Sequence, residues 1–175
     1  MRIPTTVAVL LVLPMAALAE PRLLHAGKII DVDGGTVQVD QVIAVADGKI
    51  QSVTPYSSAA FAGKVLEDWT AYTVAPGFMD MHAHLSGDIQ VADTEAYLRA
   101  KPEDDVLIGT RNARKTLEAG LTTVRDVGSY NAFTDVALRD AIAKGWIPGP
   151  RMFVAGAYVT VPGGGGEVSG LIDAA

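Results

Sequence analysis

The chain has 175 residues, of which 49% are apolar and 19% are charged, so it can build a real hydrophobic core and is not a disordered tail. Lys and Arg number 14 against 20 Asp and Glu, and this net charge of −6, with no basic cluster, disfavours a nucleic-acid-binding protein. Cysteine is absent, which excludes disulfide scaffolds, zinc–thiolate sites, iron–sulfur clusters and thiol nucleophiles, and leaves His25, His82, His84, carboxylates or an added group for any metal site.

Residues 1–19 have the pattern of a signal peptide. Met1 and Arg2 give a positive start, Val7–Ala19 is apolar apart from Pro14, and Ala17-Leu18-Ala19 is a small-x-small cleavage pattern. The apolar run is shorter than the roughly 20 residues that a membrane-spanning helix needs. A buried N-terminal helix is the alternative, but the internal proline and the abrupt polar switch at residue 20 disfavour it. We expect a periplasmic or secreted protein that is not held in a membrane once the leader is removed.

Residues 20–74 are predicted to form a small antiparallel β unit, part of a sandwich. Turn signals at Asp33-Gly34-Gly35 and Asp47-Gly48 separate short, alternating apolar segments. The expected strands cover residues 23–26, 28–32, 36–40, 41–45 and 49–53, with one or two more between Val65 and Val74.

Residues 75–175 alternate between strands and helices, which is typical of parallel βαβ units. The helix expected at 103–119 begins with three acidic residues, which suits the positive end of its dipole, and Gly120 ends it. Its apolar face is predicted through Val106, Thr110, Ala113 and Leu117. The other expected elements are strands at 78–84, 122–126 and 152–155, a short helix at 94–100, and a helix at 134–144 that ends at Gly145.

His82 and His84 are the strongest candidate site residues. Residues two apart in a strand point to the same face, so the two imidazoles can bind one divalent cation, and zinc is the usual partner of nitrogen ligands. Asp80 shares their parity. The alternative is a pair of surface or hydrogen-bonded histidines that lie close together by chance.

Three segments in order along the chain resemble the first three barrel strands of the amidohydrolase superfamily. They are Val74–Leu85, which contains Pro76-Gly77-Phe78-Met79-Asp80-Met81-His82-Ala83-His84, Gly120–Gly128 and Gly149–Gly156. The imidazolonepropionase-related and prolidase-like members are the most similar branch. The resemblance implies an α/β fold: a β-sandwich portion at 20–74, followed at 75–175 by the first three strands of an incomplete (β/α)8 barrel.

The family's chemistry is the hydrolysis of amide or related C–N bonds by metal-activated hydroxide. The resemblance implies that His82 and His84 bind the more buried of two divalent ions, taken to be zinc. Asp80 would either support these ligands or cap the strand end as a plain structural carboxylate. The expected partner is a small-molecule amide, dipeptide or cyclic amide, and a homo-oligomer is left open.

Other residues are candidates for the mouth of the site. Arg125 and Asp126 end the second strand on opposite faces, and a structural ion pair in the barrel wall is the alternative role. Gly164 and Gly165 belong to a glycine run that could bind a substrate carboxylate or simply be a flexible loop. Relatives often carry Thr-Gly-Gly-His-Gly-Asp there, and the family's histidine falls at Gly165, so that role does not carry over.

The family's later ligands have no counterpart in these residues, and no residue here is expected to be catalytic by itself. A complete barrel takes about 250 residues. We therefore expect the N-terminal part of a longer enzyme, with the 175-residue chain inactive alone. The alternative is a truncated or secreted binding module without catalysis.

Signal-peptide processing is directly testable. We expect cleavage after Ala19, because the preceding residues present the small side chains that signal peptidase accepts. N-terminal sequencing of the exported protein should begin at Glu20, and a mature product that retains Met1 would contradict the prediction.

Overall fold

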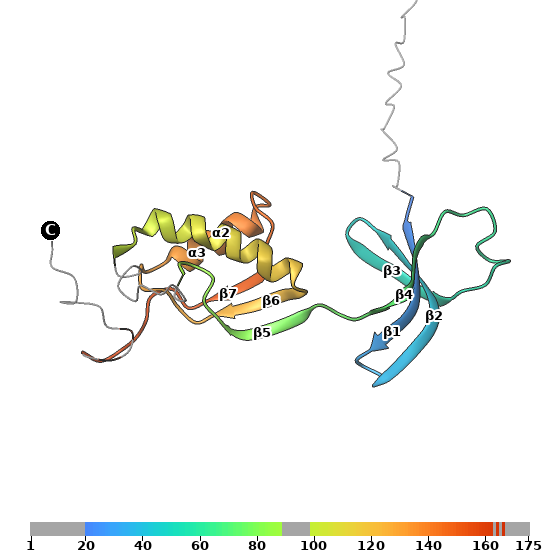
Figure 1. Cartoon of the computed structure of the whole chain (residues 1–175), viewed down its shortest axis with the longest axis horizontal. Coiled ribbons are helices and arrows are strands. Elements are labelled where there is room, and N and C mark those ends of the chain that lie inside the picture. The colour runs from blue at the N-terminus through green and yellow to red at the C-terminus, as the bar shows by residue number, and fades with distance from the viewer. Residues whose placement is uncertain (1–19, 89–98, 163, 165, 167–175) are drawn as a thin grey trace, which may run out of the picture. The chain divides into compact units, whose positions relative to one another are not determined.

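A computed structural model describes residues 20–88, 99–162, 164 and 166, and divides the chain into two compact units that meet between Pro76 and Gly77 (Figure 1). The predicted leader, most of the helix expected at 94–100, and Gly165 lie outside the described residues.

The N-terminal unit is one four-stranded sheet in the order β3-β2-β1-β4 (Figure 1). Neighbouring strands β1 and β2 are antiparallel, as are β2 and β3, and the β2–β3 turn at Asp47-Gly48 has positive φ at both residues, as a tight hairpin requires. The core contains Leu24, Ala26 and Ile43. The strands are β1 (Arg22–Asp31), β2 (Thr36–Ala46), β3 (Lys49–Pro55) and β4 (Glu67–Val74).

The prediction of a wholly antiparallel unit is wrong for β4, which pairs with β1 in parallel. The connection at residues 56–66 leads the chain from β3, at one edge of the sheet, to the far side of β1, so β4 returns in the direction of β1. In addition, the segments expected as four short strands before residue 46 form two long ones.

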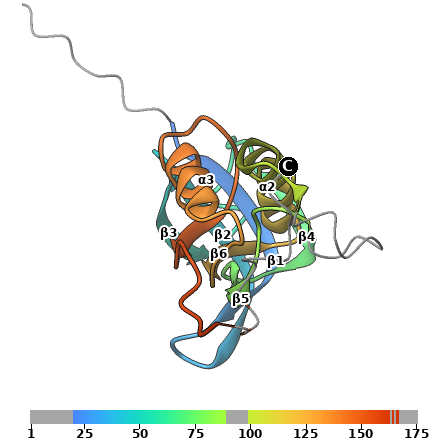
Figure 2. The same cartoon turned by 90° about the vertical axis from the view of Figure 1, so that its left-hand side faces the viewer.

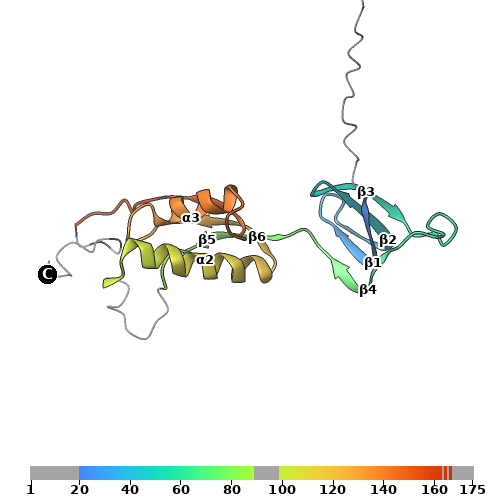
Figure 3. The ribbon, with the colours of Figure 1, turned by 90° about the horizontal axis from the view of Figure 1, so that it is seen from above.

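The C-terminal unit is a parallel three-stranded sheet in the order β5-β6-β7, and the predicted alternation of strands and helices is confirmed. Both helices lie side by side on one face of the sheet (Figures 2 and 3). They cover a core that includes Ala83, Ala113, Val124, Leu138 and Met152. The elements are β5 (Phe78–Ala83), α2 (Pro102–Glu118), β6 (Leu121–Asp126), α3 (Thr134–Ala143) and β7 (Arg151–Val154).

The opposite face of this sheet carries large apolar side chains that are exposed, namely Met79 and Phe153. A helix-covered outer face and an uncovered inner face are what a segment of a (β/α)8 barrel presents, because the barrel interior is filled by side chains from all of its strands. Among the described residues, no helix combines the length and apolarity that crossing a bilayer demands.

Gly27 is required for the parallel pairing of β1 and β4. The register shifts between Ala26 and Lys28, and a Cβ at Gly27 would overlap with the carbonyl oxygen of Thr70. Because that neighbour is backbone, it has little freedom to move away.

We expect Gly27→Ala to lower the free energy of unfolding of the N-terminal unit by at least the roughly 1–3 kcal/mol typical of overpacking. Gly34→Ala is the matched control, since its Cβ would meet only the movable side chain of Asp31, and its effect should stay within about 0.5 kcal/mol. Chemical denaturation of both variants measures the difference, and equal effects would show that the close approach of β4 does not depend on Gly27.

Candidate metal centre

His82 and His84 lie at the C-terminal end of β5, which is the end of parallel strands where barrel active sites form. Their ring centroids are 5.5 Å apart, with the ring planes at 71°. His82 is exposed and His84 is half-buried. The structure thus brings the two predicted ligands together.

The two imidazoles and Asp80 line one cavity of about 420 Å³, together with residues of α2 such as Asn112, Lys115 and Thr116. The pairing of β5 with β6 shifts register between Asp80 and Ala83, so the strict alternation assumed from sequence is interrupted there. The three side chains nevertheless share the cavity. Asn112 has a structural role, because its side-chain amide donates to the carbonyls of Leu85 and Gly87 in the loop that follows the histidines.

The hydrogen bonds of His84 determine which ring nitrogen is free. Its Nδ1 lies 2.9 Å from the carbonyl oxygen of Gly128, and a carbonyl can only accept, so Nδ1 carries the hydrogen. The hydroxyl of Tyr158 lies 3.3 Å from the same nitrogen. This arrangement leaves the Nε2 lone pair available to a cation, as in metal-binding histidines whose other nitrogen donates to a carbonyl.

Tyr158 stands behind His84 and was not identified from the sequence. Burial raises the pKa of its phenol to about 12, and the nearby Tyr130, Asp126 and Asp135 act in the same direction. The phenol is therefore neutral at physiological pH. No local sequence pattern indicates this residue: only the fold brings its ring against Gly128, where a Cβ would lie 2.7 Å from Cε1.

Asp80 holds the backbone next to the site. Its Oδ1 accepts the backbone N–H of His82 at 2.9 Å. This contact fixes the backbone of His82, a role that suits both functions considered for Asp80, a support for the ligands and a cap at the strand end.

Arg125 and Asp126 point to opposite faces, as predicted, but neither lines the cavity of the histidine pair. Asp126 is 1% exposed and accepts the backbone N–H groups of Leu85 at 2.8 Å and Gly128 at 3.1 Å. Arg125 is exposed and donates from Nε to the carbonyl of Met81. The ion pair considered for these two residues is not found in the described part of the chain, because each side chain binds backbone instead.

Burial raises the pKa of the Asp126 carboxyl, and the N–H donors of Leu85 and Gly128 oppose that shift. The carboxylate thus depends on these two backbone donors to compensate for the loss of water.

Gly164 lies in a turn, where its N–H donates to the carbonyl of Val161, and it is not among the residues that line the cavity. Gly165 lies outside the described residues, so its predicted place at the mouth remains a prediction.

Two imidazoles are a suitable but partial donor set for a divalent cation. Within residues 20–88, 99–162, 164 and 166, no cluster of three or more His, Asp or Glu side chains could hold a metal ion. Catalytic zinc sites usually have three protein ligands. The donor chemistry therefore fits zinc, with His82 and His84 as two ligands of a larger set.

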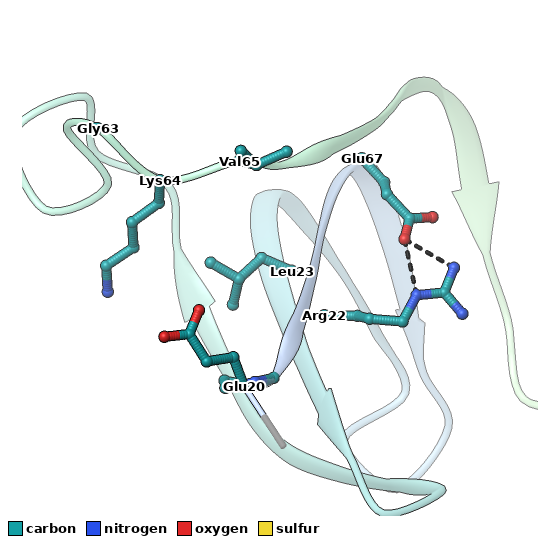
Figure 4. Close-up of a pocket in the computed structure, with 8 residues that line it drawn as sticks. Glu20, Arg22, Leu23, Gly63, Lys64, Val65 and Glu67 are labelled. Carbon is teal, nitrogen blue, oxygen red and sulfur yellow. Dashed lines mark hydrogen bonds and ion pairs between the residues drawn. The ribbon is translucent and has the colours of Figure 1, made fainter. Parts of the chain in front are cut away.

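A larger cavity, of about 690 Å³, lies in the N-terminal unit (Figure 4). It is lined by Glu20, Leu23, Lys64 and Val65, and by an exposed ion pair between Arg22 and Glu67. It contains no histidine, and its charged groups are solvated. Donor chemistry therefore favours the smaller cavity as the site, although its volume is less.

Comparison with known proteins agrees with this placement. The model of the amidohydrolase family matches residues 73–174. A Xaa-Pro dipeptidase structure with bound methionine in its active site is 33% identical with a TM-score of 0.64, over 78% of this chain and 33% of that chain. The structure of a putative prolidase from Bifidobacterium longum is 31% identical with a TM-score of 0.58, over 80% and 31% of the two chains.

A dihydroorotase from Solibacter usitatus is 42% identical over 65 residues, which are 37% of this chain and 14% of that protein. The chain thus spans about a third of the solved structures and about a seventh of this curated relative. The matches confirm the predicted fold class, in which a β unit precedes the first three strands of an incomplete (β/α)8 barrel.

The raised pKa of Tyr158 has a measurable consequence. Because its value in the folded state exceeds the ordinary 10.0, the associated stability is present below pH 10 and is lost as pH rises to about 12. In a phenolate absorbance titration of the metal-free protein, Tyr158→Phe should remove a late component near pH 12. Tyr72→Phe, at an exposed strand position, should lower the amplitude and leave that component in place. A late component that survives Tyr158→Phe would contradict the assignment.

Proposed function

Because the chain belongs to the amidohydrolase family, we propose that it forms part of an exported, metal-dependent hydrolase that cleaves C–N bonds in small amides. The single observation that supports this function most strongly is the His82–His84 pair, with Nε2 of His84 left free beside a cavity.

The roles of the residues follow from their contacts. His82 and His84 would hold a divalent cation, which when bound polarises a carbonyl and lowers the pKa of water toward about 7. Asp80 keeps the backbone of His82 in place, and Gly128 keeps the proton on Nδ1 of His84. The side-chain amide of Asn112 binds the carbonyls of Leu85 and Gly87, and so it holds the loop that follows the two histidines.

We propose that the remaining ligands come from later strands of a longer protein. Two imidazoles fall short of three protein ligands, and the chain spans about a third of the dipeptidase structure that it matches. The signal-peptide pattern of residues 1–19 supports the proposed export to the periplasm or the exterior.

The substrate we propose is a dipeptide, an N-acyl amino acid or a cyclic amide. The names of the relatives, which include a Xaa-Pro dipeptidase and a dihydroorotase, support this class. The glycine run in place of the family's histidine-containing segment is the feature that leaves the choice among these substrates open.

The test is an assay of the full-length gene product on a panel of dipeptides, N-acyl amino acids and cyclic amides. We expect hydrolysis of at least one compound, inhibition by a chelator and recovery with zinc. His82→Ala and His84→Ala should each lower metal content and kcat/KM by more than the roughly 10–100-fold that loss of an outer hydrogen-bond partner costs, whereas Asp80→Asn should stay within that range.

His25→Ala is the matched control, because His25 lies in the N-terminal unit and pairs with Asp40 rather than with the site. It should keep the metal content and activity of the parent protein. Unchanged metal content in the double variant of His82 and His84 would exclude the metal site, and a metal-loaded protein without turnover on the panel would favour a binding module.

A further inference from the structure

The buried carboxylate of Asp126 links the two loops that surround His84. One oxygen accepts the N–H of Leu85, the residue after His84, and the other accepts the N–H of Gly128, whose carbonyl binds Nδ1 of His84. These contacts form a closed ring: His84, Leu85, Asp126, Gly128 and back to His84. We propose that Asp126 is a positioning residue that fixes the orientation and tautomer of His84.

The ring acts on both the backbone and the imidazole of His84. Through Leu85, Asp126 fixes the chain direction directly after the histidine; through Gly128, it fixes the acceptor that holds the Nδ1 hydrogen. Leu85 and Gly128 are both buried. If the carboxylate were removed, no water could take its place as the acceptor for their N–H groups.

The loop at Gly128 is also confined from the other side. Its φ is +124°, and a Cβ at this position would meet the ring of Tyr158 at 2.7 Å. The peptide therefore lies between the carboxylate of Asp126 and the phenol of Tyr158. These two neighbours restrict the peptide at Gly128, and they hold its carbonyl where it accepts the imidazole hydrogen.

Asp135 provides an internal comparison. It is fully buried and likewise accepts two backbone N–H groups, those of Val136 and Gly156. Its partner Gly156 lies in the loop after β7, and neither Asp135 nor Gly156 is a hydrogen-bond partner of His84, although Tyr158 of the same loop is. Substitution of Asp135 thus imposes a similar loss of buried hydrogen bonds without touching the ring around His84.

Asp126→Asn is the decisive change, because an amide has one acceptor oxygen and its NH2 group would face the second N–H donor. One loop must be released. In metal-free, full-length protein labelled with 15N-histidine, above the ordinary imidazole pKa of about 6.5, His84 of the parent should be the Nδ1–H tautomer. The variant should show a mixture with the Nε2–H form, and His84→Ala assigns the resonance.

Cobalt(II) titration provides the second measurement. This measurement rests on the proposed function. The affinity for cobalt should fall about 10–100-fold in Asp126→Asn, which is the usual effect of losing a residue that positions a metal ligand. Asp135→Asn should keep both the parent tautomer and the parent affinity, although it too loses stability. A parent protein that fails to bind cobalt would contradict the proposed function alone, because the tautomer is measured without metal.

The proposal is overturned by any of three results: a parent His84 in the Nε2–H form, an unchanged tautomer in folded Asp126→Asn, or an equal shift in Asp135→Asn. The first of these needs no variant, so the proposal stays testable even if Asp126→Asn fails to fold. Asp126→Ser, which is smaller and can accept one N–H, offers a second variant with the same expected tautomer mixture.

Discussion

The C-terminal end of the parallel sheet is organised by buried carboxylates that accept hydrogen bonds from the surrounding loops. Asp126 joins the loops after β5 and β6, Asp135 joins α3 to the loop after β7, and Asp105 accepts from the side chain of Asn131. A buried carboxylate is costly unless donors replace the water it has lost. That requirement ties each loop to a fixed place, and the geometry at His84 depends on it.

The same sheet has two unlike faces. The helices cover Val124 and Met152, whereas Met79 and Phe153 are exposed on the other side. In a (β/α)8 barrel that second face is the interior, where side chains from alternate strands pack in layers. The site at the strand ends and the uncovered face are thus two aspects of one architecture, because strands that pack the interior also supply ligands at its rim.

The two cavities show that volume alone is a poor guide to chemistry. The larger one, in the N-terminal unit, is lined by solvated charges and the exposed Arg22–Glu67 pair, and such pairs contribute little energy. The smaller one holds two imidazoles, one of them fixed in the tautomer that a metal ligand needs. Donor type and hydrogen bonding therefore identify the site.

The sequence by itself determined the features that adjacent residues encode. Turn pairs such as Asp47-Gly48, helix stops such as Gly120 and Gly145, and the spacing of His82 and His84 are local, because backbone preferences and side-chain parity act over a few residues. The three strand motifs also indicated the family.

The tertiary structure alone decided which distant groups meet. It placed β4 parallel to β1 and gave Asp126 backbone partners in place of Arg125. On α2 it buried Ala113, as expected, together with Asp105 and Gly109, and left the expected Val106, Thr110 and Leu117 half-buried. It also placed Gly128 and Tyr158 against His84. These contacts join residues far apart in the chain, and no local pattern specifies them, because they arise only when the strands align in register and the loops between them close.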